Sequence, residues 1–117
     1  MAEYEKFTID QGSDIAIQLD LADTSGNSKN LTNYSAAAQM KRSFNSDSAD
    51  THTFTAAITD PINGTLTLTL TNQQTSLLKV GSYVYDVELS YADSSNNTII
   101  ERILEGKIRV NPNVTGI

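Results

Sequence analysis

The only histidine of the chain, His52, is the first candidate for chemistry, because histidine titrates near neutral pH. The chain has 117 residues and no cysteine. A zinc site would need further histidine or cysteine ligands, and no serine stands in a Gly-x-Ser-x-Gly frame. His52 lies where a polar stretch meets a threonine-rich segment, so we expect a solvated residue at a strand end. The sequence predicts no catalytic residue and no enzyme.

Carboxylates are the second candidates, since paired acids can hydrolyse glycosides or bind calcium. The densest set is Asp10, Asp14, Asp20 and Asp23, and it lacks the spacing of a calcium-binding loop. We expect Asp20 to point away from the core and Asp23 to open a turn. The sequence therefore predicts no metal site, no cofactor and a domain that folds without metal.

A further group of charged residues alternates along two segments near the carboxyl end. Its members are Asp86, Glu88, Glu101, Arg102, Glu105, Lys107 and Arg109. Opposite charges on neighbouring strands form cross-strand pairs that contribute only about 0.2–1 kcal/mol each. We expect an exposed, charged sheet face here.

Net charge and hydropathy exclude several classes of partner. The formal net charge is −6 and the pI is near 4.5, which disfavours nucleic acid and anionic membranes. No apolar run approaches the roughly 18 residues of a membrane-spanning helix. The amino terminus is acidic and polar, without the basic and apolar regions of a signal peptide, so we expect synthesis in a cytoplasm without secretion.

Period-two alternation of apolar and polar residues, broken by Gly, Asn, Asp and Ser, runs through the chain and predicts strands. The segments are 4–9, 14–21, 34–40, 53–58, 65–71, 83–91 and 98–110. The strictest alternation places Leu66, Leu68 and Leu70 on one face, which we expect to be buried. About seven strands without covering helices favour an all-β, immunoglobulin-like antiparallel sandwich comprising one domain, 1–117.

A short helical turn and a corner are expected between the fifth and sixth of these strands. Thr71 and Gln74 match a capping box, which predicts a turn near 72–78. The spacing of Leu78, Gly81 and Tyr83 resembles the tyrosine corner of such sandwiches, with the Tyr83 hydroxyl bonded to the backbone. The alternative is an ordinary half-buried strand tyrosine.

The last strand carries two apolar sets that are out of phase. Ile99 and Ile103 alternate against Ile100, Leu104 and Ile108. One set must face outward unless a bulge, for instance at Gly106, switches the phase. We take Ile99 and Ile103 as candidate protein-contact residues, with burial by a bulge or by the second sheet as the alternative.

Several turn and core segments resemble a small immunoglobulin-like module of tailed-bacteriophage structural proteins. They are 11–14, 21–27, 31–34, 58–60, 63–64, 70–71, 81–87, 104–107 and 110–115. The module is found in the amino-terminal domain of upper-baseplate proteins and in short virion proteins of T4-like cyanophages. Asn33 stands where such modules often have glycine, and many of these modules are followed by a longer fibre or receptor-binding region.

The resemblance implies a non-enzymatic virion structural protein, such as a baseplate, neck or tail accessory, made in the host cytoplasm. Its partners would be other virion proteins, and a homo-oligomer is compatible with this role. The alternative is a host-surface or carbohydrate-binding module. In that case Tyr4, Tyr34, Tyr85 and Tyr91 would provide aromatic contacts.

Overall fold

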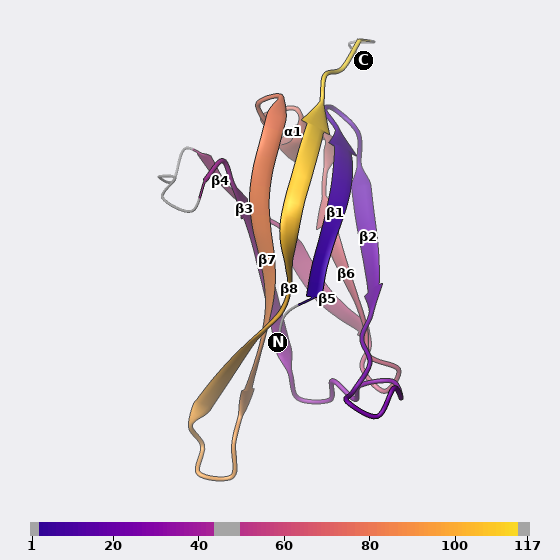
Figure 1. The fold of residues 1–117 in the computed structure, drawn as a ribbon, viewed down its shortest axis with the longest axis vertical. Helices are drawn as coiled ribbons and strands as arrows, with labels where there is room; N and C mark the ends of the chain where they lie inside the picture. The colour runs from indigo at the N-terminus through magenta and orange to yellow at the C-terminus, as the bar shows by residue number, and fades with distance from the viewer. Residues whose placement is uncertain (1–2, 44–49, 115–117) are drawn as a thin grey trace.

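The computed structural model describes residues 3–43 and 50–114, which form two packed sheets (Figure 1). The five-stranded sheet has the order β1-β8-β7-β3-β4 and the three-stranded sheet the order β2-β6-β5. The strands are β1 (Glu3–Asp10), β2 (Ile15–Asp20), β3 (Ser35–Lys41), β4 (Thr51–Thr53), β5 (Thr55–Asp60), β6 (Thr65–Leu70), β7 (Gly81–Ala92) and β8 (Thr98–Asn111). The predicted all-β sandwich is confirmed.

Strand β1 departs from the expected antiparallel arrangement. It lies at the edge of the larger sheet and pairs with β8 in parallel, with Phe7 opposite Ile108. All other strand pairs are antiparallel. The chain leaves β1 for the other sheet, so the parallel pair needs no crossover helix and leaves no helical pattern in the sequence.

The segment predicted as one strand at 53–58 is divided between the sheets. β4 belongs to the larger sheet and β5 to the smaller, and Phe54 lies between them. Phe54 is buried, and its backbone N–H donates to the Ala38 carbonyl at 3.0 Å. The chain therefore closes this side of the sandwich. Of the polar stretch at 45–50, only Asp50 falls among the described residues.

The core lies between the two sheets and follows the alternation of the sequence. Leu66, Leu68 and Leu70 are at most 3% exposed, as predicted. Val87 and Leu89 of β7 are fully buried on the facing sheet. Threonines of β6 occupy the outer face of the smaller sheet, where β-branched side chains suit a pleated surface.

Helix α1 (Asn72–Thr75) begins with the predicted capping box. The Gln74 N–H donates to the Thr71 hydroxyl, and the Thr71 N–H donates to the Gln74 side chain at 2.8 Å. The Asp14 carboxylate also accepts from the Asn72 N–H at 2.6 Å. The helix ends earlier than expected, at Thr75, and single turns carry the chain to buried Leu78.

Gly106 allows β1 to lie against β8. A Cβ at this position would collide with the Glu5 carbonyl oxygen across the strand pair. That same carbonyl accepts a hydrogen bond from the Tyr85 hydroxyl at 2.9 Å, and the Phe7 and Tyr85 rings lie 5.5 Å apart. Because Gly106 has no side chain, Tyr85 of β7 can reach past β8 and bond to the backbone of β1.

The register of β6 predicts different costs for two neighbouring substitutions. Leu68→Ala should lower the free energy of unfolding by about 2–5 kcal/mol, because it leaves a cavity in the core. Thr67→Ala, on the opposite face, should lower it by less than about 1 kcal/mol. Denaturant titration measures both, and equal losses would mean that the two faces have been misassigned.

Candidate functional site

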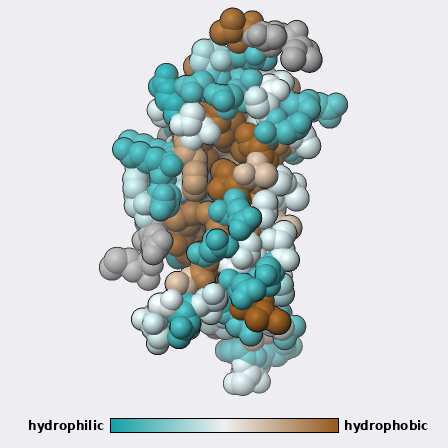
Figure 2. All heavy atoms as spheres, turned by 90° about the vertical axis from the view of Figure 1, so that its right-hand side faces the viewer, coloured by the Kyte–Doolittle hydropathy of each residue, from teal (hydrophilic) through white to brown (hydrophobic). Residues whose placement is uncertain are grey.

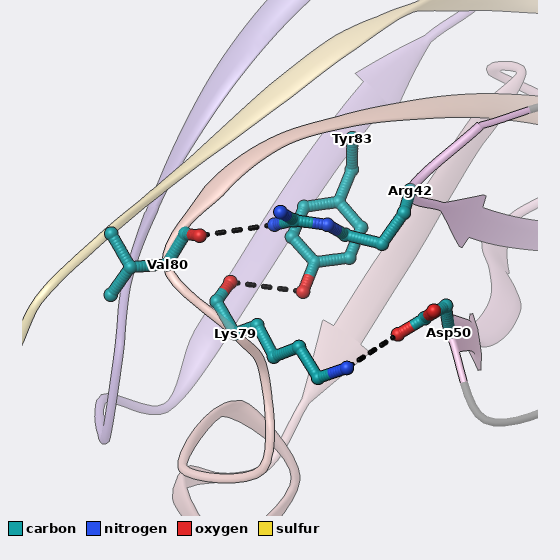
Figure 3. A network of polar contacts seen from close by, with 5 residues as sticks. All are labelled: Arg42, Asp50, Lys79, Val80 and Tyr83. Atoms are coloured by element: carbon teal, nitrogen blue, oxygen red, sulfur yellow. Dashed lines mark hydrogen bonds and ion pairs between the residues drawn. The ribbon is translucent and has the colours of Figure 1, made fainter.

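The corner between α1 and β7 contains a network of polar contacts (Figure 3). The Tyr83 hydroxyl donates to the Lys79 carbonyl at 2.9 Å, as expected of a tyrosine corner. The Arg42 guanidinium lies 5.1 Å from the centre of the Tyr83 ring and donates to the Val80 carbonyl at 3.0 Å. Lys79 forms an ion pair with Asp50 at 3.1 Å. The corner therefore connects Arg42, directly after β3, and Asp50, directly before β4, to the segment that leads into β7.

The three residues predicted for the corner lie together. Leu78 and Tyr83 are buried. Gly81 has a φ of +132°, and a Cβ there would lie 2.8 Å from the nearest Arg42 nitrogen. The roles of Arg42 and Asp50 in the corner could not be predicted from the sequence, because no local motif relates these residues to Lys79. The arrangement stabilises the fold and brings no reactive group to a substrate.

His52 is half-buried rather than solvated, contrary to expectation. It lies opposite buried Met40 and packs edge-on against Tyr83 with the ring centres 6.0 Å apart. Partial burial lowers the pKa of His52 below its ordinary value of 6.5, Asp50 opposes this shift, and Lys79 adds to it. The neutral imidazole is favoured in the folded protein, so His52 belongs to the corner's packing.

The four carboxylates that lie close together in the sequence each take part in a different local structure; they are Asp10, Asp14, Asp20 and Asp23. Asp14 caps α1, as described, and Asp20 accepts from the Thr65 hydroxyl at 2.7 Å. Asp10 accepts weakly from the Asn111 side chain at 3.5 Å. Within residues 3–43 and 50–114, no three histidine or acidic side chains are grouped to hold a metal ion.

Asp23 has a counterpart, Asp93, that the sequence analysis missed. Each carboxylate accepts the backbone N–H groups of the residues two and four positions later, at 2.8–3.0 Å. Gly26 and Asn96 occupy the same place in the two loops with positive φ, and the flanking backbone bonds match as well. The shared pattern Asp-x-Ser-Gly/Asn-Asn could have identified this pair of Asx turns.

The expected cross-strand charge pairing centres on Arg102. Its guanidinium lies 3.3 Å from Asp86 on β7 and 4.0 Å from Glu105 on its own strand. All three side chains are substantially exposed, so these pairs add little stability.

The hairpin formed by β7 and β8 continues beyond the sandwich (Figure 1). A bulge shifts the register where Val87 pairs with Leu104 but Glu88 with Arg102, so the extra residue is Ile103. The bulge is not at Gly106, and it divides the second apolar set, because Leu104 and Ile108 are buried on one side of it and Ile100 is exposed on the other. Ile99 and Ile103 are both half-buried, Ile103 against the core, whereas Ile100 is 64% exposed.

The inner face of this hairpin packs on the loop before β3, close to the projecting end of the hairpin. The Tyr34 and Tyr91 rings stack with centres 4.7 Å apart, and Lys29 lies over Tyr34 and 3.9 Å from Glu101. Tyr85 is buried in the core and Tyr4 is exposed on β1. The four tyrosines considered for carbohydrate binding therefore form no common platform.

The side of the sandwich at the outer edges of β1 and β2, here called the open side, is only partly covered. Among the described strands, β1 pairs with β8 alone and β2 with β6 alone. Core-facing side chains at these edges remain half-buried; they are Phe7, Ile15, Ile17 and Leu19. Figure 2 faces this side and shows hydrophobic atoms in a band between hydrophilic flanks.

Comparison with known proteins supports the architecture. No protein-family model and no curated protein sequence matches the chain. Murine CRIg is similar in structure, with a TM-score of 0.50, 16% sequence identity and 92% of each chain covered. AggA, the major subunit of aggregative adherence fimbriae type I from Escherichia coli, has a TM-score of 0.34 and 10% identity over 92% of this chain and 89% of that chain. Among the described residues, no helix is long and apolar enough to cross a membrane.

The corner hydrogen bond predicts the effect of removing one oxygen atom. Tyr83→Phe should lower the free energy of unfolding by about 0.5–1.5 kcal/mol, because the Lys79 carbonyl loses its donor. Tyr4→Phe, at an exposed position, is the matched control and should change it by less than about 0.5 kcal/mol. Chemical denaturation compares the two, and equal effects would argue against the corner bond.

Proposed function

We propose that this chain is a non-enzymatic structural protein of a tailed-bacteriophage virion, as a baseplate, neck or tail accessory, and that it acts through contacts with other virion proteins. The resemblance of its turn and core segments to phage immunoglobulin-like modules supports this role. Among the described residues, Asp14 caps α1, Asp20 accepts from Thr65 and Asp86 pairs with Arg102.

The observation that carries the proposal is the projecting end of the β7–β8 hairpin. Ile100 is 64% exposed there and shares its face with Ser90, its partner across the hairpin. Charged Glu88 and Arg102 form the next pair on that face. An apolar residue inside a polar surround is typical of the centre of a small protein contact. Because of the bulge, we propose Ile100 as the contact residue in place of Ile99 and Ile103.

Side-chain packing supports the inner face of the hairpin. Its inner face packs Tyr91 on Tyr34, and Ile103 joins the core at its base. An interface residue on a supported strand loses less conformational freedom on binding than one on a loose loop.

Incorporation into particles tests the role. In a phage whose own copy of this gene is replaced by the variant, Ile100→Ser should leave the melting temperature unchanged, because the side chain is exposed, and should reduce the amount of this protein in purified virions. Mass spectrometry of the particles measures that amount.

Ile62→Ser is the matched control, since Ile62 is 69% exposed on the turn after β5. It should leave incorporation unchanged. Absence of the unsubstituted protein from purified virions would refute the virion role, whereas equal incorporation of both variants would exclude only the hairpin contact.

A further inference from the structure

On the open side, the outer edges of β1 and β2 pair with no described strand, and an apolar strip is only partly covered. Seen down the shortest axis, β2 extends laterally beyond β1 (Figure 1). The core-facing residues of β2 are Ile15, Ile17 and Leu19, and all three remain half-buried. A strand placed beside β1 in the larger sheet would lie over them, because stacked sheets pack about 10 Å apart face to face.

On the opposite side of the sandwich the chain passes directly from one sheet to the other. There the chain crosses between sheets at Phe54, which is buried and bonded to the backbone of β3. The corner network of Arg42, Lys79 and Asp50 lies on that side as well. On the open side, β1 and β2 belong to different sheets and share no backbone ladder.

The outer edge of β1 presents backbone groups for pairing. In a parallel pair, each residue directs its N–H and C=O to the same side, and this side alternates along the strand. The Glu5 carbonyl and the Gln11 N–H face β8, since they meet Gly106 and the Asn111 carbonyl. The backbone groups of Lys6 and Thr8 therefore point outward, to an edge that pairs with no described strand.

Acidic side chains lie at the two ends of this strip, and Lys6 follows Glu5 on β1. Asp10 and Asp14 flank the turn from β1 to β2 at one end. Glu5 and Asp20 lie at the other end, where β1 begins and β2 finishes. None of these four carboxylates forms an ion pair with a described residue. The middle of the strip, around Phe7 and Ile17, is apolar.

From these observations we propose that the open side binds an extended segment of another protein, which adds to the edge of β1 as a strand. Its inward side chains are apolar and cover Ile15, Ile17 and Leu19, and Lys or Arg residues stand at both of its ends. Edge pairing of this kind draws affinity from backbone hydrogen bonds and specificity from alternate side chains. A second copy of this acidic chain would bring like charges together at these ends, so it fits the site less well.

The proposal rests on the proposed function only for the identity of the partner as a virion protein. It can be tested on the isolated protein with an eight-residue peptide, the length of β1, of sequence Lys-Val-Thr-Val-Thr-Val-Thr-Lys. One control peptide has Glu in place of both Lys residues, and another has Ser in place of the three Val residues. The first peptide should bind at least about tenfold more tightly than either control.

Variants of the edge separate strand addition from simple charge attraction. Thr8→Pro removes the outward N–H and is compatible with an edge strand, whereas Thr8→Val keeps it. We expect Thr8→Pro to weaken binding of the lysine peptide about tenfold and Thr8→Val to have little effect. Protection of the Phe7 and Ile9 amides against hydrogen exchange checks that β1 stays docked on β8 in both variants.

Charge variants provide a second test that does not alter the backbone. Glu5→Gln combined with Asp10→Asn should weaken binding of the lysine peptide and reduce its dependence on salt. In the unsubstituted protein, the lysine peptide should slow hydrogen exchange at the Lys6 and Thr8 amides.

Three results would overturn the proposal. Equal affinity for the valine and serine peptides would reduce the interaction to charge attraction. Unchanged Lys6 and Thr8 exchange in the complex would place the peptide elsewhere. Concentration-dependent protection of these amides without peptide would identify a second copy as the occupant. None of these results bears on the presence of the chain in virions, so each proposal can fail separately.

Discussion

The contact on which this structure depends is the close approach of β1 to β8 at Gly106. Any side chain there would collide with the Glu5 carbonyl. The space left by glycine instead allows the Tyr85 hydroxyl to reach that carbonyl from β7. The contacts at Gly106 thus connect three neighbouring strands, β1, β8 and β7. The pairing of β1 with β8 therefore determines where the edge of the larger sheet and the open side lie.

The two sides of the sandwich have opposite characters because the chain crosses between sheets differently on each. At Phe54 the crossing is immediate and buried, and the tyrosine corner reinforces the same side. Between β1 and β2 the connection is a turn at one end only, from Gln11 to Asp14. The apolar residues of β2 are consequently covered by the core on one side only. This asymmetry is the basis on which we propose strand addition at the edge of β1.

Much of the fold could be predicted from residue patterns that act locally. The alternation of Leu66, Leu68 and Leu70 with threonines sets the faces of β6 without reference to any partner. The capping box at Thr71 and the corner at Tyr83 depend on residues only a few positions apart. These features are specified by period and spacing, so one sequence suffices to find them.

Features that depend on distant residues could not be predicted in the same way. The parallel pairing of β1 with β8 joins the two ends of the domain. The bulge at Ile103 is a matter of register between two long strands, and Gly106 was the more visible but wrong candidate for it. Arg42 reaches Tyr83 and Val80 only once the sheets have formed. The candidate contact at Ile100 follows from that bulge and was therefore missed.

Hydrogen exchange of the isolated protein, resolved at single amides of β1, tests the central claim most directly. An outer edge that pairs with no other strand predicts alternation: the amides of Phe7 and Ile9 face β8 and exchange slowly, whereas those of Lys6 and Thr8 face solvent and exchange fast. Slow exchange at all four amides would contradict the account, because it would show that the edge of β1 is already occupied.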